Sequence, residues 1–202
     1  MKKLVLLILA LFVTGVAAAD SNYPASSLYQ LSAQLTNQSA QVHGLDVYEG
    51  HPVLVTLFYG SCSHTCPLLI ETARSIDRAA ADPNLRVLMI SIDPDHDTPE
   101  FLSKLAKERR IDTTRWTLAR ADAQNVRKIA AALSIQYRQA PDGEFNHASI
   151  ITLLTPAGEI AHQSSTLGKA DEALVAALRA HADEQKKTLA KSAKLATPEG
   201  RK

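Results

Sequence analysis

Two continuous apolar runs, separated by a helical stretch, constrain the fold of this chain more than any other feature. The first run, PVLVTLFY, covers residues 52–59, and the second, LRVLMISID, covers residues 85–93. Runs of this length and composition are typical of strands buried on both faces of a sheet. Between them, from Pro67 onward, apolar residues recur with a helical period until the break at 82–84. A strand–helix–strand order predicts an α/β domain with a central sheet.

The rest of the chain continues this alternation. Thr98 and Pro99 are the expected cap and first residue of a helix that ends near residue 110. The other expected elements are a strand at 116–119, a helix at 122–133, a turn at Asp142–Gly143, strands at 148–154 and 159–163 joined by a turn at 156–158, and a last helix from 169 to about 187. The alternation places flanking helices on a central sheet.

The segment before the first core strand has a different pattern. Residues 28–41 alternate apolar and polar side chains around a turn at 36–39, which predicts an N-terminal β-hairpin. Residues 20–27 are polar, so we expect them to be loose. The folded domain is therefore predicted to cover residues 28–185.

The first nineteen residues have the organisation of a cleavable secretory signal. Two lysines precede an apolar run at 4–13 and small residues at 14–19. About 20 apolar residues are needed to cross a bilayer, so the run is short for a membrane span. We expect cleavage after Ala19 and a periplasmic mature protein without a stable membrane span. The alternative is an uncleaved segment that anchors the protein in the inner membrane.

Charge excludes broad classes of partner. Lys and Arg number 22 against 21 Asp and Glu, and loss of Lys2 and Lys3 would change the formal net charge from +1 to −1. A near-neutral chain offers no general electrostatic attraction, so no nucleic acid partner is expected. Residues 186–202 carry six basic side chains and little apolar content, which predicts a solvated, partly disordered tail.

The two cysteines of the chain lie between the first core strand and its helix, in the stretch GSCSHTCP at 60–67. Cys62 and Cys66 are four residues apart, so both sulfurs face one side if the first helical turn includes them. A helix N-terminus favours thiolates, which redox chemistry and soft-metal binding both require. The spacing leaves three interpretations open: a structural disulfide, a redox-active pair, or half of a site for a soft ion such as Cu(I).

Seven histidines are candidates for a third ligand. Four lie in segments without a polar partner motif: His43, His51, His162 and His181. His64 lies between the cysteines and is either a ligand or an exposed residue at the loop tip, and His96 lies in an acidic loop. His147 differs because it immediately precedes the strand expected at 148–154. We expect a loop there to approach the sheet end that bears the cysteines.

Three motifs in a fixed order resemble the Sco/SenC family. They are C-x-x-x-C-P after the first core strand, SIDPDHDTPEFL at 91–102 and NHASIITLLTPAGEI at 146–160. The resemblance runs from about residue 28 to 181. It implies a thioredoxin-like fold with a mixed sheet, in a copper-binding protein that assists assembly of cytochrome c oxidase. In that family two cysteines and the histidine before the late strand bind one copper ion, and these roles fall on Cys62, Cys66 and His147.

The chain also departs from the family pattern. The usual proline and acidic residue after the first cysteine are Ser63 and His64 here, and His96 replaces the usual basic residue of the acidic loop. The usual transmembrane anchor is replaced by the expected cleaved signal. The ligand residues themselves are kept.

Asp93 and Asp97 match the acidic loop of the family. Each has a plain structural interpretation, with Asp97 capping the helix at Thr98–Pro99 and Asp93 ending the strand by binding loop N–H groups. The alternative is a role in the site, in which a carboxylate orients His147 by contacting it without binding the metal.

Two functions of different classes follow. The first is a periplasmic chaperone, rather than an enzyme, that holds Cu(I) or Cu(II) and passes it to the copper-site subunit of cytochrome c oxidase or another client. The second is a thiol–disulfide oxidoreductase, in which Cys62 and Cys66 reduce a client and a thioredoxin-like protein restores them. Thioredoxins have two residues between the cysteines and a cis-proline facing them. The three residues here, and His147 at the place of that proline, favour the metal. A third interpretation is a peroxidase of the same broad fold, but this chain has no companion threonine or arginine motif that would support it.

Overall fold

The two long apolar runs form neighbouring parallel strands at the centre of the molecule. The computed structural model describes residues 23–62, 65–141 and 144–196. The runs become β3 (Val53–Phe58) and β4 (Arg86–Ser91), which are joined by helix α1 (Thr65–Ala80). Every residue of β3 is buried, as are all residues of β4 after Arg86. Burial on both faces is the reason that these strands show no apolar–polar alternation.

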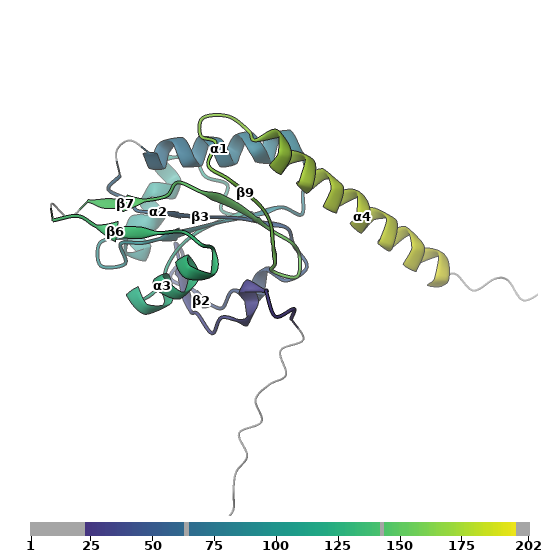
Figure 1. Cartoon of the computed structure of the whole chain (residues 1–202), viewed down its shortest axis with the longest axis horizontal. Helices are drawn as coiled ribbons and strands as arrows, with labels where there is room; N and C mark the ends of the chain where they lie inside the picture. Colours follow the sequence, from purple (N-terminus) through teal and green to yellow (C-terminus); the bar gives the residue numbers. More distant parts are fainter. Residues whose placement is uncertain (1–22, 63–64, 142–143, 197–202) are drawn as a thin grey trace, which may run out of the picture.

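Five further strands complete a mixed sheet. They are β1 (Leu35–Asn37), β2 (Val42–His43), β5 (Trp116–Arg120), β8 (Ile151–Leu154) and β9 (Ile160–Ser164). The order across the sheet is β2-β1-β5-β4-β3-β8-β9, with β3, β4 and β5 parallel and the remaining pairs antiparallel (Figure 1). The α/β class with a central mixed sheet is therefore confirmed.

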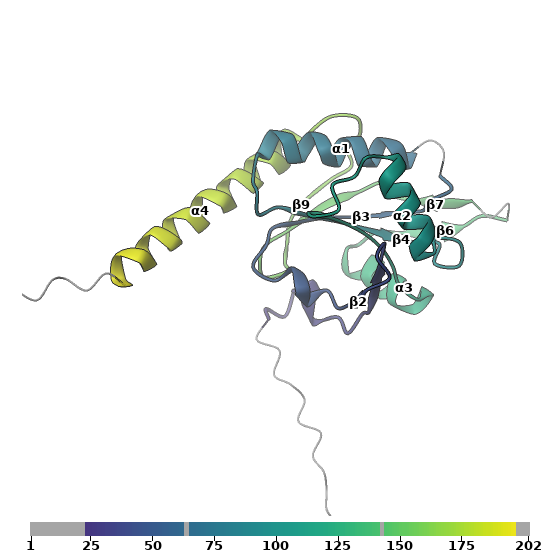
Figure 2. The same cartoon turned by 180° about the vertical axis from the view of Figure 1, so that it is seen from behind.

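Helices cover both faces of this sheet. Besides α1 they are α2 (Pro99–Glu108), α3 (Ala123–Ala132) and α4 (Glu172–Ala196), with single 3-10 turns at Leu28–Gln30 and Asp46–Tyr48. Helices α1, α2 and α4 lie on one face, and α3 lies on the other with the N-terminal segment (Figures 1 and 2). The successive crossovers β3–α1–β4 and β4–α2–β5 run in the same direction across the sheet, so right-handed connections place α1 and α2 on the same face.

The N-terminal hairpin is present, but it lies later in the chain than expected, because Thr36 and Asn37, placed in the turn, belong to β1 and the second strand is β2 at 42–43. β1 and β2 pair in antiparallel register, with Leu35 opposite His43. The first part of the alternating segment is a 3-10 turn and not a strand, because the Ser27 hydroxyl accepts a hydrogen bond from Tyr29 N–H and caps it. The same hydroxyl donates to the Ala157 carbonyl at 2.6 Å. Residue 27, expected to be loose, is therefore fixed to the domain.

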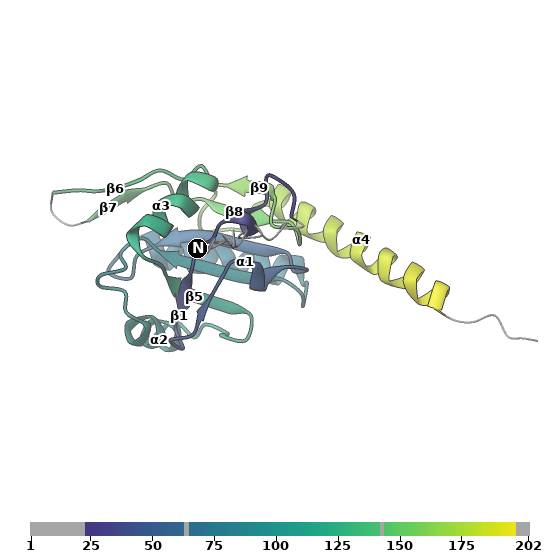
Figure 3. The same ribbon diagram turned by 90° about the horizontal axis from the view of Figure 1, so that it is seen from below.

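A second hairpin was not expected from the sequence. β6 (Tyr137–Gln139) and β7 (Phe145–His147) pair in antiparallel register and project beyond the end of the sheet (Figure 3). The turn predicted between them, Asp142–Gly143, lies outside the described residues. The strand expected at 148–154 begins only at Ile151, so His147 belongs to β7.

The last helix is longer than expected. α4 continues to Ala196 instead of ending near residue 187, because the sequence beyond that point is rich in good helix formers such as Ala, Leu and Lys. The boundary placed at 186 therefore falls inside a helix. The expected signal at 1–19 lies outside the described residues, and within the part of the chain that is described no helix is long and apolar enough to cross a membrane.

Candidate metal centre

The fold brings the two cysteines together at the N-terminus of α1. Cys62 lies in the loop that follows β3, and Cys66 lies in the first turn of the helix. The two thiols are not joined in a disulfide; Cys62 is partly exposed and Cys66 is buried. The Cys66 N–H donates to Cys62 Sγ at 3.4 Å, so the first sulfur occupies a capping position on the helix. This is the carboxyl end of the parallel strands, where functional groups gather in α/β sheets.

The environments of the two thiols differ. Burial raises the pKa of the Cys66 thiol, and the neighbouring Cys62 and Asp97 add to this effect. At Cys66 this effect opposes the preference for a thiolate that a helix N-terminus gives. Metal binding would have to release the Cys66 proton. Cys62 is the more accessible of the two sulfurs.

His147 provides an imidazole at the end of the β6–β7 hairpin. It is the last residue of β7 and lies opposite Tyr137 of β6. Its Nδ1 is buried and makes no hydrogen bond within the described part of the chain. Burial also lowers the pKa of His147, which keeps the imidazole neutral. A neutral ring with an unpaired nitrogen is the form that coordinates a metal.

Tyr59 contacts both parts of this site. Its ring lies edge-on to His147, with centroids 5.9 Å apart, and packs against Phe145 at 5.3 Å. Its hydroxyl donates to Glu144 Oε2 at 2.6 Å. Burial, the bond to Glu144 and a hydrogen bond with the Cys62 side chain together raise the pKa of Tyr59, so the phenol stays neutral. Sequence reasoning missed this residue, although an aromatic side chain three positions before Cys62 was a possible signal.

The three expected ligands are not assembled into one site in this structure. Among the described residues, no three His, Cys, Asp or Glu side chains lie near enough to one another to hold a single ion. Cys62 and His147 are instead connected through Tyr59. The donor set nevertheless fits copper, since two thiols and an imidazole are ligands that copper prefers.

Asp97 holds in place the segment at 59–62 that follows β3 and carries Cys62, called the cysteine loop below. It is buried, and its Oδ2 accepts hydrogen bonds from Gly60 N–H at 2.9 Å and from the Ser91 hydroxyl at 2.5 Å. Burial raises the pKa of Asp97. The helix cap is Thr98, whose hydroxyl accepts from Phe101 N–H, so the interpretation of Asp97 as the cap is wrong. Asp97 thus acts on the loop of Cys62.

Asp93 has a local partner. Its carboxylate oxygens lie 2.8 and 2.9 Å from His96 Nδ1, and this contact raises the pKa of the exposed His96. Its backbone carbonyl accepts from the N–H groups of His96 and Asp97. Asp93 therefore organises its own loop, but the loop N–H groups bind its backbone carbonyl and not its carboxylate, which contacts the His96 ring.

Three of the other histidines have partners of their own. His43 Nδ1 lies 2.9 Å from the Gly44 carbonyl, and His51 Nδ1 lies 3.1 Å from the Asn84 carbonyl. His162 Nε2 lies 3.7 Å from Asp171. His64 lies outside the described residues. His147, by contrast, contacts Tyr59, whose carbonyl accepts from Cys62 N–H.

Comparison with known proteins identifies the family. The family model described as SCO1/SenC matches residues 24–183, which is most of the chain. The chain belongs to the SCO1/SenC family. Its similarity to a curated relative points the same way: the mitochondrial protein SCO1 homolog of Homo sapiens is 30% identical over 121 residues. That alignment covers 55% of this chain but 39% of the human protein, so the chain spans less than two thirds of this relative.

Solved structures confirm the thioredoxin-like fold of this SCO1/SenC protein. A putative electron transfer protein from Aquifex aeolicus has a TM-score of 0.69 at 22% identity, covering 76% of this chain and 92% of its own. Bradyrhizobium japonicum ScoI, solved with copper bound, has a TM-score of 0.60 at 22% identity, covering 74% of this chain and 96% of its own. At these identities the similarity establishes the fold.

Proposed function

We propose that this SCO1/SenC protein carries one copper ion, bound through Cys62, Cys66 and His147, and delivers it to the copper-site subunit of cytochrome c oxidase. One observation carries the proposal: two reduced sulfurs at a helix N-terminus lie one tyrosine away from a buried, unpaired imidazole nitrogen. Membership of the family and the copper bound by the Bradyrhizobium relative support it.

The three ligand residues have different roles in binding and releasing the copper ion. Cys62 is partly exposed, so an incoming client thiolate can exchange with it first. Cys66 is buried in the first turn of α1 and retains the ion until that exchange has begun. His147 completes the site when β7 and the cysteine loop approach each other. Two thiolates suffice for Cu(I), whereas Cu(II) gains more from the imidazole.

The same pair supports a second function, thiol–disulfide exchange. The partly exposed Cys62 thiolate would attack a client disulfide, forming a mixed disulfide and releasing one client thiolate. The Cys66 thiol would then give its proton to the released client thiolate and attack Cys62 Sγ, closing the Cys62–Cys66 disulfide and releasing the second client sulfur as a thiolate. Two electrons pass to the client, and a thioredoxin-like reductant restores the pair. The observation that favours this function is the unequal exposure of the two sulfurs.

His147→Ala separates the two functions. Copper delivery needs the imidazole, whereas disulfide reduction needs the two thiols. We expect the variant to lose Cu(II) to a chelator much faster than the wild type while it reduces a model disulfide at an unchanged rate. Cys62→Ala and Cys66→Ala should each lose both activities, and His181→Ala on α4 is the matched histidine control.

The cellular counterpart measures oxidase assembly in a strain that lacks the protein, at limiting copper. Under the proposal, the His147→Ala gene behaves like the deletion, and added copper partly restores assembly. Full assembly with His147→Ala at limiting copper would exclude delivery through this site and favour the reductase function.

Location is part of the proposal. We propose that residues 1–19 direct export to the periplasm and are removed there. The lysines, apolar run and Ala17–Ala19 support this. The intact mass of the exported protein should correspond to a chain that begins at Asp20. A membrane-bound form that retains Met1 would show that the segment is an anchor.

A further inference from the structure

Tyr59 is the residue that joins the two halves of the candidate copper site. It directly follows β3, at the start of the cysteine loop, and its side chain is 5% exposed. On one side its carbonyl accepts a hydrogen bond from Cys62 N–H at 3.3 Å. On the other it reaches the β6–β7 hairpin at Glu144, Phe145 and His147.

The contacts along the hairpin form a continuous row. Tyr137 of β6 packs on Phe145 with centroids 6.5 Å apart, Phe145 packs on the Tyr59 ring, and the Tyr59 ring meets His147 edge-on. The 2.6 Å hydrogen bond to Glu144 adds a directed link to this apolar packing, at the opposite end of β7 from His147. One side chain therefore holds β7 at both ends.

We infer that Tyr59 is a positioning residue for copper: it fixes the β6–β7 hairpin over the cysteine loop, so that His147 can join the two sulfurs with little movement. The inference rests on the proposed function. The hairpin is a two-stranded pair outside the main sheet, and such a pair is marginally stable by itself. Without the Tyr59–Glu144 bond, the ion would have to order the hairpin when it binds, and this cost would appear as weaker binding.

The inference predicts which oxidation state is affected. Cu(I) can be held by the two cysteines, so a looser hairpin should affect it little. Cu(II) depends on the imidazole and should be lost more readily. Tyr59→Phe keeps the ring packing against Phe145 and His147 but removes the hydroxyl that bonds Glu144. It is therefore a selective change.

The experiment compares Tyr59→Phe, Glu144→Ala and the double variant with the wild type, using the full mature chain loaded anaerobically with one equivalent of copper. We expect each single variant to lose Cu(II) to EDTA about three- to tenfold faster, the range of one hydrogen bond. The nitrogen hyperfine coupling in the Cu(II) EPR spectrum should weaken at the same time. Transfer of Cu(I) to bathocuproine disulfonate should stay within about twofold. The double variant should be no worse than either single variant.

Tyr137→Phe is the matched control, because it removes a tyrosine hydroxyl from the same aromatic row and leaves the Tyr59–Glu144 bond in place. It should behave as the wild type does. Wild-type Cu(II) retention in Tyr59→Phe, or strictly additive losses in the double variant, would overturn the inference while the proposed function stands. If the wild type shows no nitrogen coupling and His147→Ala changes nothing, the proposed function itself fails.

Discussion

At the scale of single residues, Gly60 leaves no room for a side chain where the cysteine loop begins. A Cβ there would overlap the ring of Phe101 and lie 2.5 Å from Asp97 Oδ1. Phe101 is partly exposed and can turn aside, whereas Asp97 is buried and bonded to Ser91 and to Gly60 itself. The loop of Cys62 is thus held by a close approach of backbone and carboxylate.

Gly60→Ala should therefore destabilise the protein and displace the loop. We expect a loss of about 1–3 kcal/mol in the free energy of unfolding, the usual cost of forcing atoms into a packed site. Urea unfolding of the reduced, metal-free protein measures it, and copper retention should fall in parallel. Ser61→Ala, at an exposed neighbouring position, is the control and should change stability by less than about 0.5 kcal/mol. Unchanged unfolding in Gly60→Ala would mean that Asp97 does not restrain the loop.

His64 tests the choice of the third ligand. It lies between the cysteines but outside the ligand set that the family resemblance implies. His64→Ala should leave the copper stoichiometry at one per chain and at most weaken Cu(II) binding. Metal analysis after gel filtration measures the stoichiometry. If His64→Ala lost copper as completely as Cys62→Ala does, His64 and not His147 would be the third ligand.

The residues of the site differ in how far the sequence could reveal them. Cys62, Cys66 and His147 stand in motifs, so their candidacy was visible. The role of Asp97 was ambiguous, because its partners Gly60 and Ser91 come from two other segments and only the folded sheet brings them together. Tyr59 was overlooked because its position at the end of an apolar run suggested core packing.

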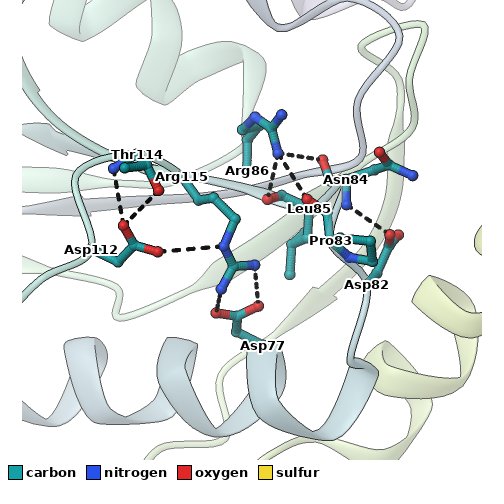
Figure 4. A network of polar contacts seen from close by, with 9 residues as sticks. All are labelled: Asp77, Asp82, Pro83, Asn84, Leu85, Arg86, Asp112, Thr114 and Arg115. Carbon is teal, nitrogen blue, oxygen red and sulfur yellow. Dashed lines mark hydrogen bonds and ion pairs between the residues drawn. The ribbon is translucent and has the colours of Figure 1, made fainter.

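At the scale of elements, a polar network links α1 to the amino ends of the parallel strands, the end of the sheet away from the cysteines (Figure 4). Arg115, just before β5, donates to Asp77 of α1 through two parallel bonds of 2.9 and 2.8 Å. Its Nε also lies 3.6 Å from Asp112. A forked guanidinium contact of this kind is geometrically specific as well as charged. It fixes the C-terminal part of the helix whose N-terminus carries Cys66.

Arg115→Lys measures how much the two parallel bonds contribute to stability. Lysine keeps the charge but cannot make both bonds, so we expect a loss of about 1–2 kcal/mol in the free energy of unfolding. Copper retention should be unchanged, since the network lies at the amino ends of the parallel strands. Lys104→Ala, which removes an exposed pair with Glu108, is the control and should cost less than about 1 kcal/mol. An Arg115→Lys variant as stable as the wild type would show that charge alone suffices.

Elements with long, regular patterns were predictable and short ones were not. β3, β4 and α2 follow from continuous apolar runs and from the Thr98–Pro99 start signal. β6 and β7 have three residues each, too few for a period to show, and their pairing depends on the aromatic row with Tyr59. The expected late strand was consequently drawn too long toward His147.

At the scale of the whole molecule, packing and chemistry occupy different ends of the sheet. The N-terminal segment closes the end away from the cysteines, where Leu28 N–H donates to the Gly158 carbonyl at 2.8 Å and Gly50 N–H donates to the Pro156 carbonyl at 2.9 Å. The cysteine loop and the hairpin occupy the other end. Changes that destabilise one end need not alter the chemistry of the other, which makes the copper variants interpretable.

Helix α4 divides in the same way into a packed part and a projecting part. Leu174, Val175 and Leu178 are buried in its first turns, where the helix packs against α1 and β9. Arg179 then donates to the Ala79 carbonyl, and Asn84 donates to Gln185. Beyond this point the helix extends away from the domain in every view (Figures 1, 2 and 3).

A chain that stops after Lys187 should therefore fold as stably as the full protein. We expect its free energy of unfolding to agree within about 0.5 kcal/mol and its copper retention to be unchanged, because the residues removed leave the packed turns intact. Leu178→Ala is the opposite control and should cost about 2–5 kcal/mol, since it empties a fully buried position. Both are measured by urea unfolding at two protein concentrations. If the truncation lowered the free energy of unfolding as much as Leu178→Ala does, the projecting half of α4 would contribute to the fold. If that loss appeared only at the higher protein concentration, the projecting half would act through contacts between chains.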